Sequence, residues 1–344
     1  MSRFKFSVGP WNVHDGADSY GPATRDEIAF EENVKKFAEI GFSAVQFHDD
    51  DAVPNMNELS EEEIKIEARK VKSILDKYNL AAEFVAPRLW MDPHTIDGGF
   101  MSTCEKDREF AIWRAYRSID IANELGCDKI VLWLAREGTL CAESKSPVWA
   151  TKQLIDAINK MLEYDEKIKI LIEPKPNEPI DRSICGTIGH VMGVSAATVD
   201  PSRVGGLLES AHAILAGLDP SHEIGFGLAM GKLWGVHLND QNGIKFDQDK
   251  TFGVENLRQA FNQIKVLMEN NYGSNGEYIG LDVKAMRTTK NEDRYKHLEN
   301  SLKIAKALEE KASRFDYDLQ RKCVENRDFE GLEMYVMNLL MGVE

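Results

Sequence analysis

The stretch REFAIWRAYRSIDIANELGCDKIVLWLA, residues 108–135, contains the structural unit that decides the fold. Its first part has apolar residues at helical spacing and stops at Gly126, and glycine is a common residue at helix ends. Two residues later comes KIVLWLA, a short apolar run typical of a buried strand. The stretch therefore predicts a helix that is followed directly by a strand.

The same alternation continues in both directions along the chain. Eight runs have the character of strands: residues 5–12, 42–48, 81–89, 129–135, 169–175, 204–210, 233–239 and 278–284. Helix-like segments lie between or after many of them: residues 28–40, 60–79, 108–126, 150–164, 254–270 and 294–312. Gly41 marks a predicted helix end, and Ser60 with Glu63 forms a predicted capping box at a helix start.

Eight strand-then-helix units predict an α/β fold, a closed parallel (β/α)8 TIM barrel. A doubly wound open sheet is the alternative, but no G-x-G-x-x-G turn follows the first strand. We assign residues 1–312 to the barrel, as the catalytic domain. Residues 313–344 contain no ninth strand and are assigned to a short helical C-terminal extension.

Composition narrows the choice of partners. The 344 residues include 57 acidic and 42 basic ones, so the net charge is −15, which disfavours binding to nucleic acid or to anionic membranes. No apolar run approaches the length of a membrane span. The five cysteines are odd in number and lack a Cys-x-x-Cys pair, which argues against a disulfide framework and favours a cytoplasmic protein.

The ends of four consecutive predicted strands carry potential metal ligands. Barrel enzymes place their chemistry at the C-terminal ends of strands, and here these ends hold Glu173, Glu209, His237 and Asp282. Carboxylates crowded at one barrel mouth repel one another unless a cation neutralises them. Three carboxylates and one imidazole suit Mg²⁺ or Mn²⁺, and they can also bind Co²⁺. Any one of these residues alone is more often structural, but their coincidence at one end of the barrel predicts a metal site.

A second set of ligands lies close by in the sequence. His212 follows Glu209 by three residues, and Asp247 and Asp249 follow the seventh strand. Glu209 could therefore bridge two divalent cations. The histidines at positions 14, 94, 190, 222 and 297 are expected to be surface or structural residues.

Five short motifs stand out in the sequence: FHDDD (47–51), DGGF (97–100), WLAREG (133–138), EPKPNEP (173–179) and QNGIKFDQD (241–249). In their residues and in their order along the chain, these motifs resemble the xylose isomerase family. The resemblance implies a (β/α)8 barrel that converts an aldose to a ketose with two divalent cations. It implies that Glu173, Glu209 and Asp282 bind the first cation, and that Glu209, His212, Asp247 and Asp249 bind the second.

The resemblance also implies roles for residues around the cations. His48, oriented by Asp51, matches a residue implicated in opening the sugar ring, and Lys175 matches a lysine that contacts the carbonyl oxygen of the substrate. The expected substrate-binding residues are Trp90 and Trp133 as aromatic walls, Trp11 and Asn239 at strand ends, and Tyr20, which falls near an aromatic that enters a neighbouring subunit's site in this family.

The sequence departs from the family pattern at three places. His237 stands where xylose isomerases have an aspartate, which removes one negative charge and is similar to rhamnose isomerases of the same superfamily. Ala86 and Arg88 replace small polar residues, so the substrate need not be xylose. The C-terminal tail is shorter than in typical members, so a homo-oligomer is expected but the choice between dimer and tetramer stays open.

The predicted function is a metal-dependent aldose–ketose isomerase that acts on a small-molecule sugar by a metal-assisted hydride shift. A sugar epimerase of the same barrel superfamily, or a rhamnose isomerase-like enzyme with a different aldose substrate, is the alternative. A non-catalytic sugar-binding barrel is the alternative of another class, although binding alone does not require two cations.

Overall fold

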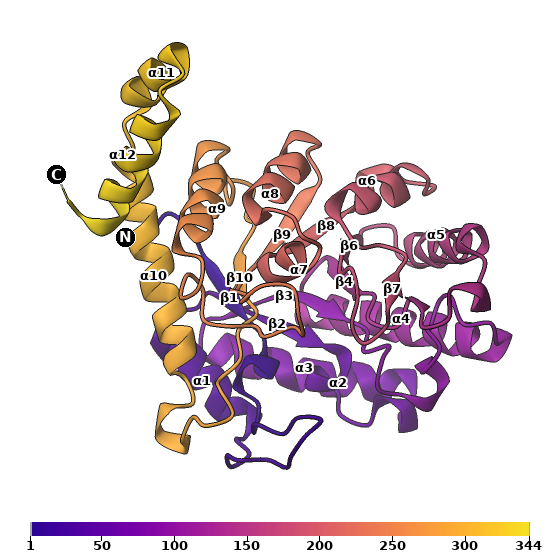
Figure 1. Cartoon of the computed structure of the whole chain (residues 1–344). Coiled ribbons are helices and arrows are strands. Elements are labelled where there is room, and N and C mark those ends of the chain that lie inside the picture. The colour runs from indigo at the N-terminus through magenta and orange to yellow at the C-terminus, as the bar shows by residue number, and fades with distance from the viewer. Residues whose placement is uncertain (1, 344) are drawn as a thin grey trace.

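Eight parallel strands close into a barrel in the computed structural model, which describes residues 2–343 (Figure 1). Around the barrel each strand pairs with the next, and β10 pairs with β1. The strands are β1 (Phe6–Val8), β2 (Ala44–His48), β3 (Ala81–Ala86), β4 (Lys129–Trp133), β6 (Lys169–Glu173), β8 (Val204–Glu209), β9 (Leu233–Leu238) and β10 (Ile279–Leu281). The predicted TIM barrel is confirmed. Two further short strands, β5 (Gly138–Thr139) and β7 (Arg182–Ser183), pair with each other outside it.

Helices surround the barrel. They are α1 (Phe30–Ile40), α2 (Asp49–Ala52), α3 (Glu61–Lys77), α4 (Glu105–Leu125), α5 (Pro147–Tyr164), α6 (Ile188–Ala196), α7 (Ser210–Leu215), α8 (Pro220–Ala229), α9 (Leu257–Glu269) and α10 (Lys296–Ser313). Gly41 ends α1 with a φ of 104°, a left-handed conformation that costs glycine little. The capping box of Ser60 and Glu63 starts α3. Both predicted helix boundaries are therefore confirmed.

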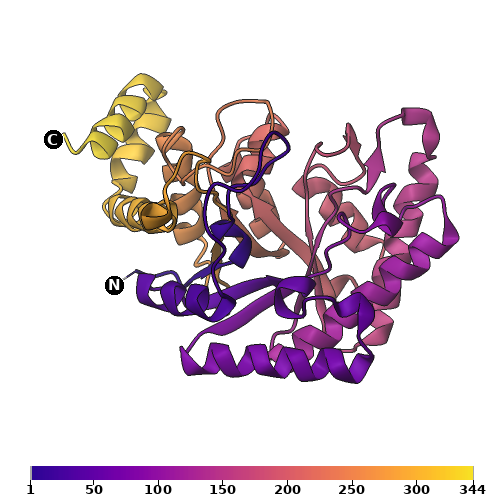
Figure 2. The same ribbon diagram turned by 90° about the horizontal axis from the view of Figure 1, so that it is seen from below.

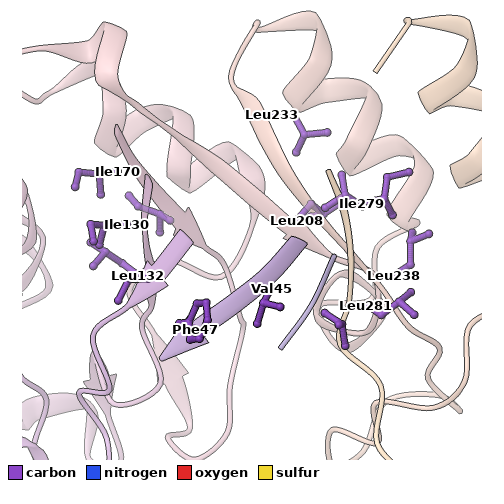
Figure 3. Packing of buried hydrophobic residues seen from close by; sticks show 14 of the residues in the cluster. Val45, Phe47, Ile130, Leu132, Ile170, Leu208, Leu233, Leu238, Ile279 and Leu281 are labelled. Carbon is purple, nitrogen blue, oxygen red and sulfur yellow. The ribbon is translucent and has the colours of Figure 1, made fainter. Parts of the chain in front are cut away.

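Two apolar layers hold the barrel together. The outer layer lies between the strands and the helices and includes Val45, Ile130 and Leu132 (Figure 3). Val131, between the latter two in β4, belongs instead to a small cluster with Phe84, Ala86, Leu171 and Leu207. Successive residues of a strand thus face opposite sides, and every second strand residue faces the barrel interior. This alternation brings side chains at the strand ends into one shared mouth.

The chain beyond α10 forms a helical hairpin. It consists of α11 (Tyr317–Asn326) and α12 (Phe329–Met341), which lie beside α10 and away from the barrel mouth (Figures 1 and 2). Phe315, Val336 and Leu340 are its buried contacts with the rest of the chain. The predicted helical C-terminal extension is confirmed. Across residues 2–343, none of the helices combines the length and apolar character that a membrane crossing requires.

The structure differs from the sequence prediction in detail. β1 spans only three residues, and a short 3-10 turn over Pro10–Val13 follows it, because a proline cannot continue the strand pairing. The helices α6, α7 and α8 fall in stretches for which no helix was predicted.

Candidate functional site

The ends of β6, β8, β9 and β10 bring the four predicted ligands of the first cation together. Ligand atoms of Glu173, Glu209, His237 and Asp282 all lie within 4.8 Å of one another. His237 Nδ1 is 3.7 Å from carboxylate oxygens of Glu209 and Asp282, and 3.9 Å from Glu173 Oε1. Glu209 and His237 are register partners on adjacent strands, so the parallel pairing itself places them side by side. We call these four residues the first cluster.

A second cluster shares Glu209 with the first. His212, in the first turn of α7, has its Nε2 3.2 Å from both Glu209 Oε1 and Asp247 Oδ2. Ligand atoms of Glu209, His212 and Asp247 lie within 4.8 Å of one another. Asp249, which was predicted to belong here, is buried nearby but pairs with Lys284 and accepts a hydrogen bond of 3.0 Å from Asn239 Nδ2. The structure therefore groups three of the four predicted ligands of the second cation.

The electrostatics of the two clusters show uncompensated negative charge. Burial, together with the neighbouring Glu209 carboxylate, raises the pKa values of Glu173 and Asp282. For Glu209 burial acts upward too, but His212 and His237 outweigh it and lower the pKa to about 2. The ionised Glu209 carboxylate thus makes ionisation of Glu173 and Asp282 less favourable. A cation bound among the three carboxylates would remove this repulsion.

Unpaired polar atoms support the same conclusion. His212 Nδ1, Asp247 Oδ1 and both ring nitrogens of His237 are buried and have no hydrogen-bond partner among the described residues. Leaving such atoms unpaired costs free energy, whereas a cation coordinated by them would satisfy them. The donor set of carboxylates and imidazoles suits Mn²⁺, Mg²⁺ or Co²⁺. The residues of both clusters thus fit divalent cations.

A cavity of about 210 Å³ adjoins the clusters. One side of the cavity is aromatic. The rings of Trp90 and Trp133 meet edge to face with centroids 4.5 Å apart, and the ring centroids of Trp11 and His48 are 4.4 Å apart. Trp11 Nε1 also donates a hydrogen bond of 3.1 Å to Asp282 Oδ1, which joins the aromatic side to the first cluster. The cavity thus combines an apolar wall with a polar, ligand-rich base, as small-molecule sites commonly do.

His48 lies at the end of β2 and at the rim of this cavity. Its Nδ1 is 2.9 Å from Asp51 Oδ2, the arrangement expected from the sequence. Arg88 adds a contact that was not predicted: its Nη2 lies 2.8 Å from the same Nδ1 and 3.1 Å from Asp51 Oδ1. Burial raises the pKa of Asp51, but His48 and Arg88 outweigh it and the net shift is downward. Asp51 therefore stays ionised beside the imidazole.

Lys175 and Asn239 hold the second cluster from two sides. Lys175 Nζ donates a hydrogen bond of 2.8 Å to Asp247 Oδ2 and lies 5.2 Å from the centroid of the Trp133 ring. Asn239 does not line the cavity: its amide donates to Glu209 Oε1 at 2.8 Å and accepts from the backbone N–H of Ala211. Its position is that of a group that orients Glu209 rather than one that meets a ligand directly.

Tyr20 lies apart from all of these residues. Its side chain is 98% exposed and does not line the cavity of its own chain. The predicted role in a neighbouring subunit's site, and the homo-oligomer that it requires, stay predictions.

Five cavity-lining residues were not predicted as site residues: Phe84, Ala86, Arg88, Val131 and Lys284. Lys284 follows Asp282 by two residues, so the period-2 alternation of a strand end could have identified it. Phe84 and Arg88 fit the same alternation: Phe84 lies within β3, and Arg88 follows the last residue of that strand, Ala86, by two positions.

Comparisons with known proteins agree with the fold. Residues 34–296 match the family described as "Xylose isomerase-like TIM barrel". The barrel resembles that of a D-tagatose 3-epimerase-like protein, with a TM-score of 0.66 and 19% identity over 89% of this chain and 99% of that chain. D-psicose 3-epimerase from Clostridium cellulolyticum H10 gives a TM-score of 0.64 and 9% identity, with coverage of 89% and 99%. 3-Keto-D-glucoside 4-epimerase from E. coli gives 0.60 and 13%, with coverage of 88% and 99%. At these identities the structural likeness shows the fold alone.

Proposed function

The chain belongs to the xylose isomerase-like TIM barrel family, and we propose that it is a metal-dependent sugar isomerase that interconverts an aldose and its ketose. The observation that carries this proposal is the pair of clusters sharing Glu209 beside an aromatic-walled cavity. Binding a neutral sugar does not require two cations, whereas moving charge between adjacent sugar oxygens does benefit from them.

In this proposal Glu173, Glu209, His237 and Asp282 would hold one divalent cation, and Glu209, His212 and Asp247 the other. When bound, the cations supply Lewis-acid polarisation of the sugar oxygens. Asn239 keeps the Glu209 carboxylate in place for both, through its hydrogen bond to Oε1.

The remaining residues act on the sugar itself. His48, held by Asp51 and Arg88, transfers a proton to and from the ring oxygen as the cyclic sugar opens. Lys175 donates a hydrogen bond to the oxygen on which negative charge develops. A hydride moves from C2 to C1, and the proton that leaves O2 is returned to O1, so the aldehyde becomes an alcohol and C2 becomes a ketone without net gain or loss of atoms. Trp90 and Trp133 exclude water from these carbons.

A panel of pentoses and hexoses, assayed for ketose formation with Mn²⁺, Mg²⁺ or Co²⁺, tests the proposal. We expect turnover of at least one aldose, and we expect Lys175→Met and His48→Asn to lower kcat by about 10²-fold or more while metal binding persists. Exposed Met91→Ala, whose side chain lies outside the cavity lining, serves as the control. Bound cation without turnover of any aldose would identify a sugar-binding barrel instead.

Epimerisation is the second candidate, because the similar structures named above are those of epimerases or an epimerase-like protein. An epimerase needs an acid and a base on opposite faces of one carbon. Glu173 and Asp282 come from strands that β8 and β9 separate, so they approach the cavity from two sides.

Isotope exchange distinguishes the two reactions. A hydride shift between C2 and C1 leaves the migrating hydrogen unexchanged in D₂O. Proton abstraction by a carboxylate introduces solvent deuterium at the reacting carbon. Mass spectrometry of the product formed in D₂O therefore decides between isomerase and epimerase chemistry.

A further inference from the structure

Arg88 lies on the side of the cavity that faces the two clusters. In the closed barrel β2 and β3 are neighbours, and other strands separate them on both sides from β6, β8 and β9. His48 ends β2, Arg88 follows β3, and both line the cavity. The proposed cations would bind the oxygens of the reacting carbons, C1 and C2. The wall that contains His48 and Arg88 would therefore meet the other end of the sugar.

The guanidinium group of Arg88 is held in one orientation by its neighbours. Nε donates a hydrogen bond of 2.6 Å to Asp50 Oδ1. Nη2 lies 3.1 Å from Asp51 Oδ1 and 2.8 Å from His48 Nδ1. The guanidinium carbon is also 5.6 Å from the centroid of the Trp90 ring. A guanidinium group that is already fixed loses little conformational freedom when it binds a ligand, so Arg88 is preorganised for binding.

The remaining amino group of Arg88, Nη1, is available to a ligand. No side chain or backbone oxygen within residues 2–343 accepts a hydrogen bond from it, and it is not one of the buried nitrogen atoms that lack a partner. Nη1 is therefore accessible, and Arg88 lines the cavity. Ala86, two residues earlier, lines the cavity too and adds only a methyl group. An oxygen of a bound sugar can thus accept a hydrogen bond from Nη1.

The charges around Arg88 indicate which kind of oxygen it binds. Arg88 forms ion pairs with Asp50 and Asp51. Arg114 forms ion pairs with Asp49 at 2.7 Å and with Asp50 at 3.4 Å. The three carboxylates thus outnumber the two guanidinium groups by one. A carboxylate on the ligand would add a further negative charge to this group, whereas a hydroxyl adds none. The surroundings therefore favour a neutral sugar over an acidic one.

We propose that Arg88 is a specificity-determining residue, whose Nη1 donates a hydrogen bond to the hydroxyl at the end of an aldose remote from C1. The protein then selects sugars that carry this terminal hydroxyl over their terminally deoxygenated counterparts. The inference rests on the proposed function, because the proposed cations decide which end of the sugar faces Arg88. Hydrogen bonds from an ionised donor are among the stronger ones, so loss of the acceptor should be measurable in binding.

Sugar alcohols test this selection without turnover, because they are open chains that lack a carbonyl group. The protein in excess Mn²⁺ is titrated by calorimetry with xylitol, ribitol, D-arabinitol, D-glucitol, D-mannitol and galactitol. The tightest binder is then compared with its analogue that lacks the terminal hydroxyl and with its analogue that carries a carboxylate there. We expect the parent protein to bind the hydroxyl form about tenfold or more tightly than the deoxy form.

Variants of Arg88 show whether this preference depends on its side chain. Arg88→Met removes the donor and should reduce the preference to less than about threefold. Arg88→Lys keeps a positive charge beside Asp50 and Asp51, which protects the fold, but its single ammonium group lacks the second arm of the guanidinium and should lose the preference too. Arg69→Met removes a half-exposed guanidinium of α3 and, as the matched control, should keep the parent preference. A purely structural role of Arg88 would weaken both polyols equally.

Retention of the parent preference in both Arg88→Met and Arg88→Lys would overturn the proposal, as would failure of all six polyols to bind in excess Mn²⁺. Tighter binding of the carboxylate analogue than of the polyol by the parent, but not by Arg88→Met, would also overturn it, because Arg88 would then bind an acid. If the preference depends on Arg88 but no aldose is converted, the proposed isomerase function fails and this inference stands. If aldoses are converted but the preference is insensitive to Arg88, the reverse holds.

Discussion

Two buried histidines, His237 and His297, have pKa values shifted in opposite directions, because their neighbours differ. His237 lies among carboxylates, and Glu209 and Asp282 outweigh burial to raise its pKa. His297 has no such neighbours: its Nε2 donates a hydrogen bond of 2.8 Å to the backbone oxygen of Asn12. Burial therefore lowers the pKa of His297 to about 4.

This difference predicts a pH dependence of stability. Below pH 6.5 the unfolded chain protonates His297, but the folded protein does not until about pH 4. The free energy of unfolding therefore falls as the pH drops below 6.5, and the loss from His297 reaches about 3 kcal/mol at pH 4. Between pH 7 and pH 4, urea denaturation should show that His297→Gln loses about 3 kcal/mol less of its free energy of unfolding than the parent protein does. The exposed His222→Gln should follow the parent, and equal losses in all three proteins would contradict the prediction.

The residues of the first cluster could be predicted from the sequence, whereas the buried hydrogen bond between Gln46 and Glu83 could not. Glu173, Glu209 and Asp282 stand where an apolar run ends, and in a parallel barrel all such ends converge. Gln46 and Glu83 lie inside predicted strands, where a polar residue ordinarily faces outward. Their inward position became apparent only with the barrel closed, because closure decides which face of each strand is the interior.

At the scale of elements, Arg114 joins α4 to α2 through ion pairs with Asp49 and Asp50, of which the pair with Asp49 is the closer. Asp49 is fully buried, and Arg114 of α4 donates to both of its oxygens at 2.7 and 2.8 Å. The four-residue α2 also carries Asp51, so this pair anchors the segment that holds His48.

Breaking the pair should be costly. Asp49→Asn removes the fully buried partner of Arg114 and leaves only Asp50, whose Oδ2 lies 3.4 Å from Arg114 Nη2, so we expect a loss of about 3 kcal/mol in the free energy of unfolding. Glu67→Gln, which breaks the exposed pair with Lys70, should cost less than about 1 kcal/mol. Urea denaturation of the two variants measures both, and a similar small loss in each would count against the role of Asp49.

The C-terminal hairpin should be separable from the site. Every proposed ligand precedes residue 283, whereas α11 and α12 pack beside α9 and α10 through Phe315, Val336 and Leu340. A chain ending at Ser313 should lose roughly 2 kcal/mol of stability, or about 5 °C in Tm, through exposure of the face that the hairpin covers. Its Mn²⁺ Kd should equal that of the full chain. Phe329→Ser, at a side chain that is 57% exposed, is the control and should barely change Tm.

Helices whose apolar residues recur at helical spacing were predictable, and glycine-rich ones were not. α1, α3, α4, α5, α9 and α10 all fall within or close to predicted segments. α6 and α8 each contain two glycines, which disfavour an isolated helix. In α8 a Cβ on Gly227 would lie 3.2 Å from the Cβ of Leu233, so close packing on β9 accounts for that glycine. Tertiary packing overrides the local preference there.

At the scale of the whole molecule, the proposed cation binding would be coupled to folding. The residues of the two clusters lie in or directly after β6, β8, β9 and β10, in α7 and in the loop after β9, so unfolding would release any bound cation. A cation at 100 times its Kd should stabilise the fold by about 2.7 kcal/mol, and a chelator should remove this gain.

Thermal unfolding with and without Mn²⁺ measures this coupling. Glu209 belongs to both clusters, so Glu209→Gln should abolish the rise in Tm. Glu310→Gln, at an exposed position in α10, should leave it intact. A Tm that does not respond to Mn²⁺ in the parent protein would exclude tight binding.

The site divides along the chain as well as in space. The proposed ligands all come from residues 173–282, after β4, and the aromatic wall with His48 comes from residues 11–133. One crossover in the α5 region would therefore take the proposed cation ligands from one parent and the aromatic wall, together with His48, from another. Such a chimaera would inherit the proposed ligands as an undivided block, while the walls of the cavity would change around them.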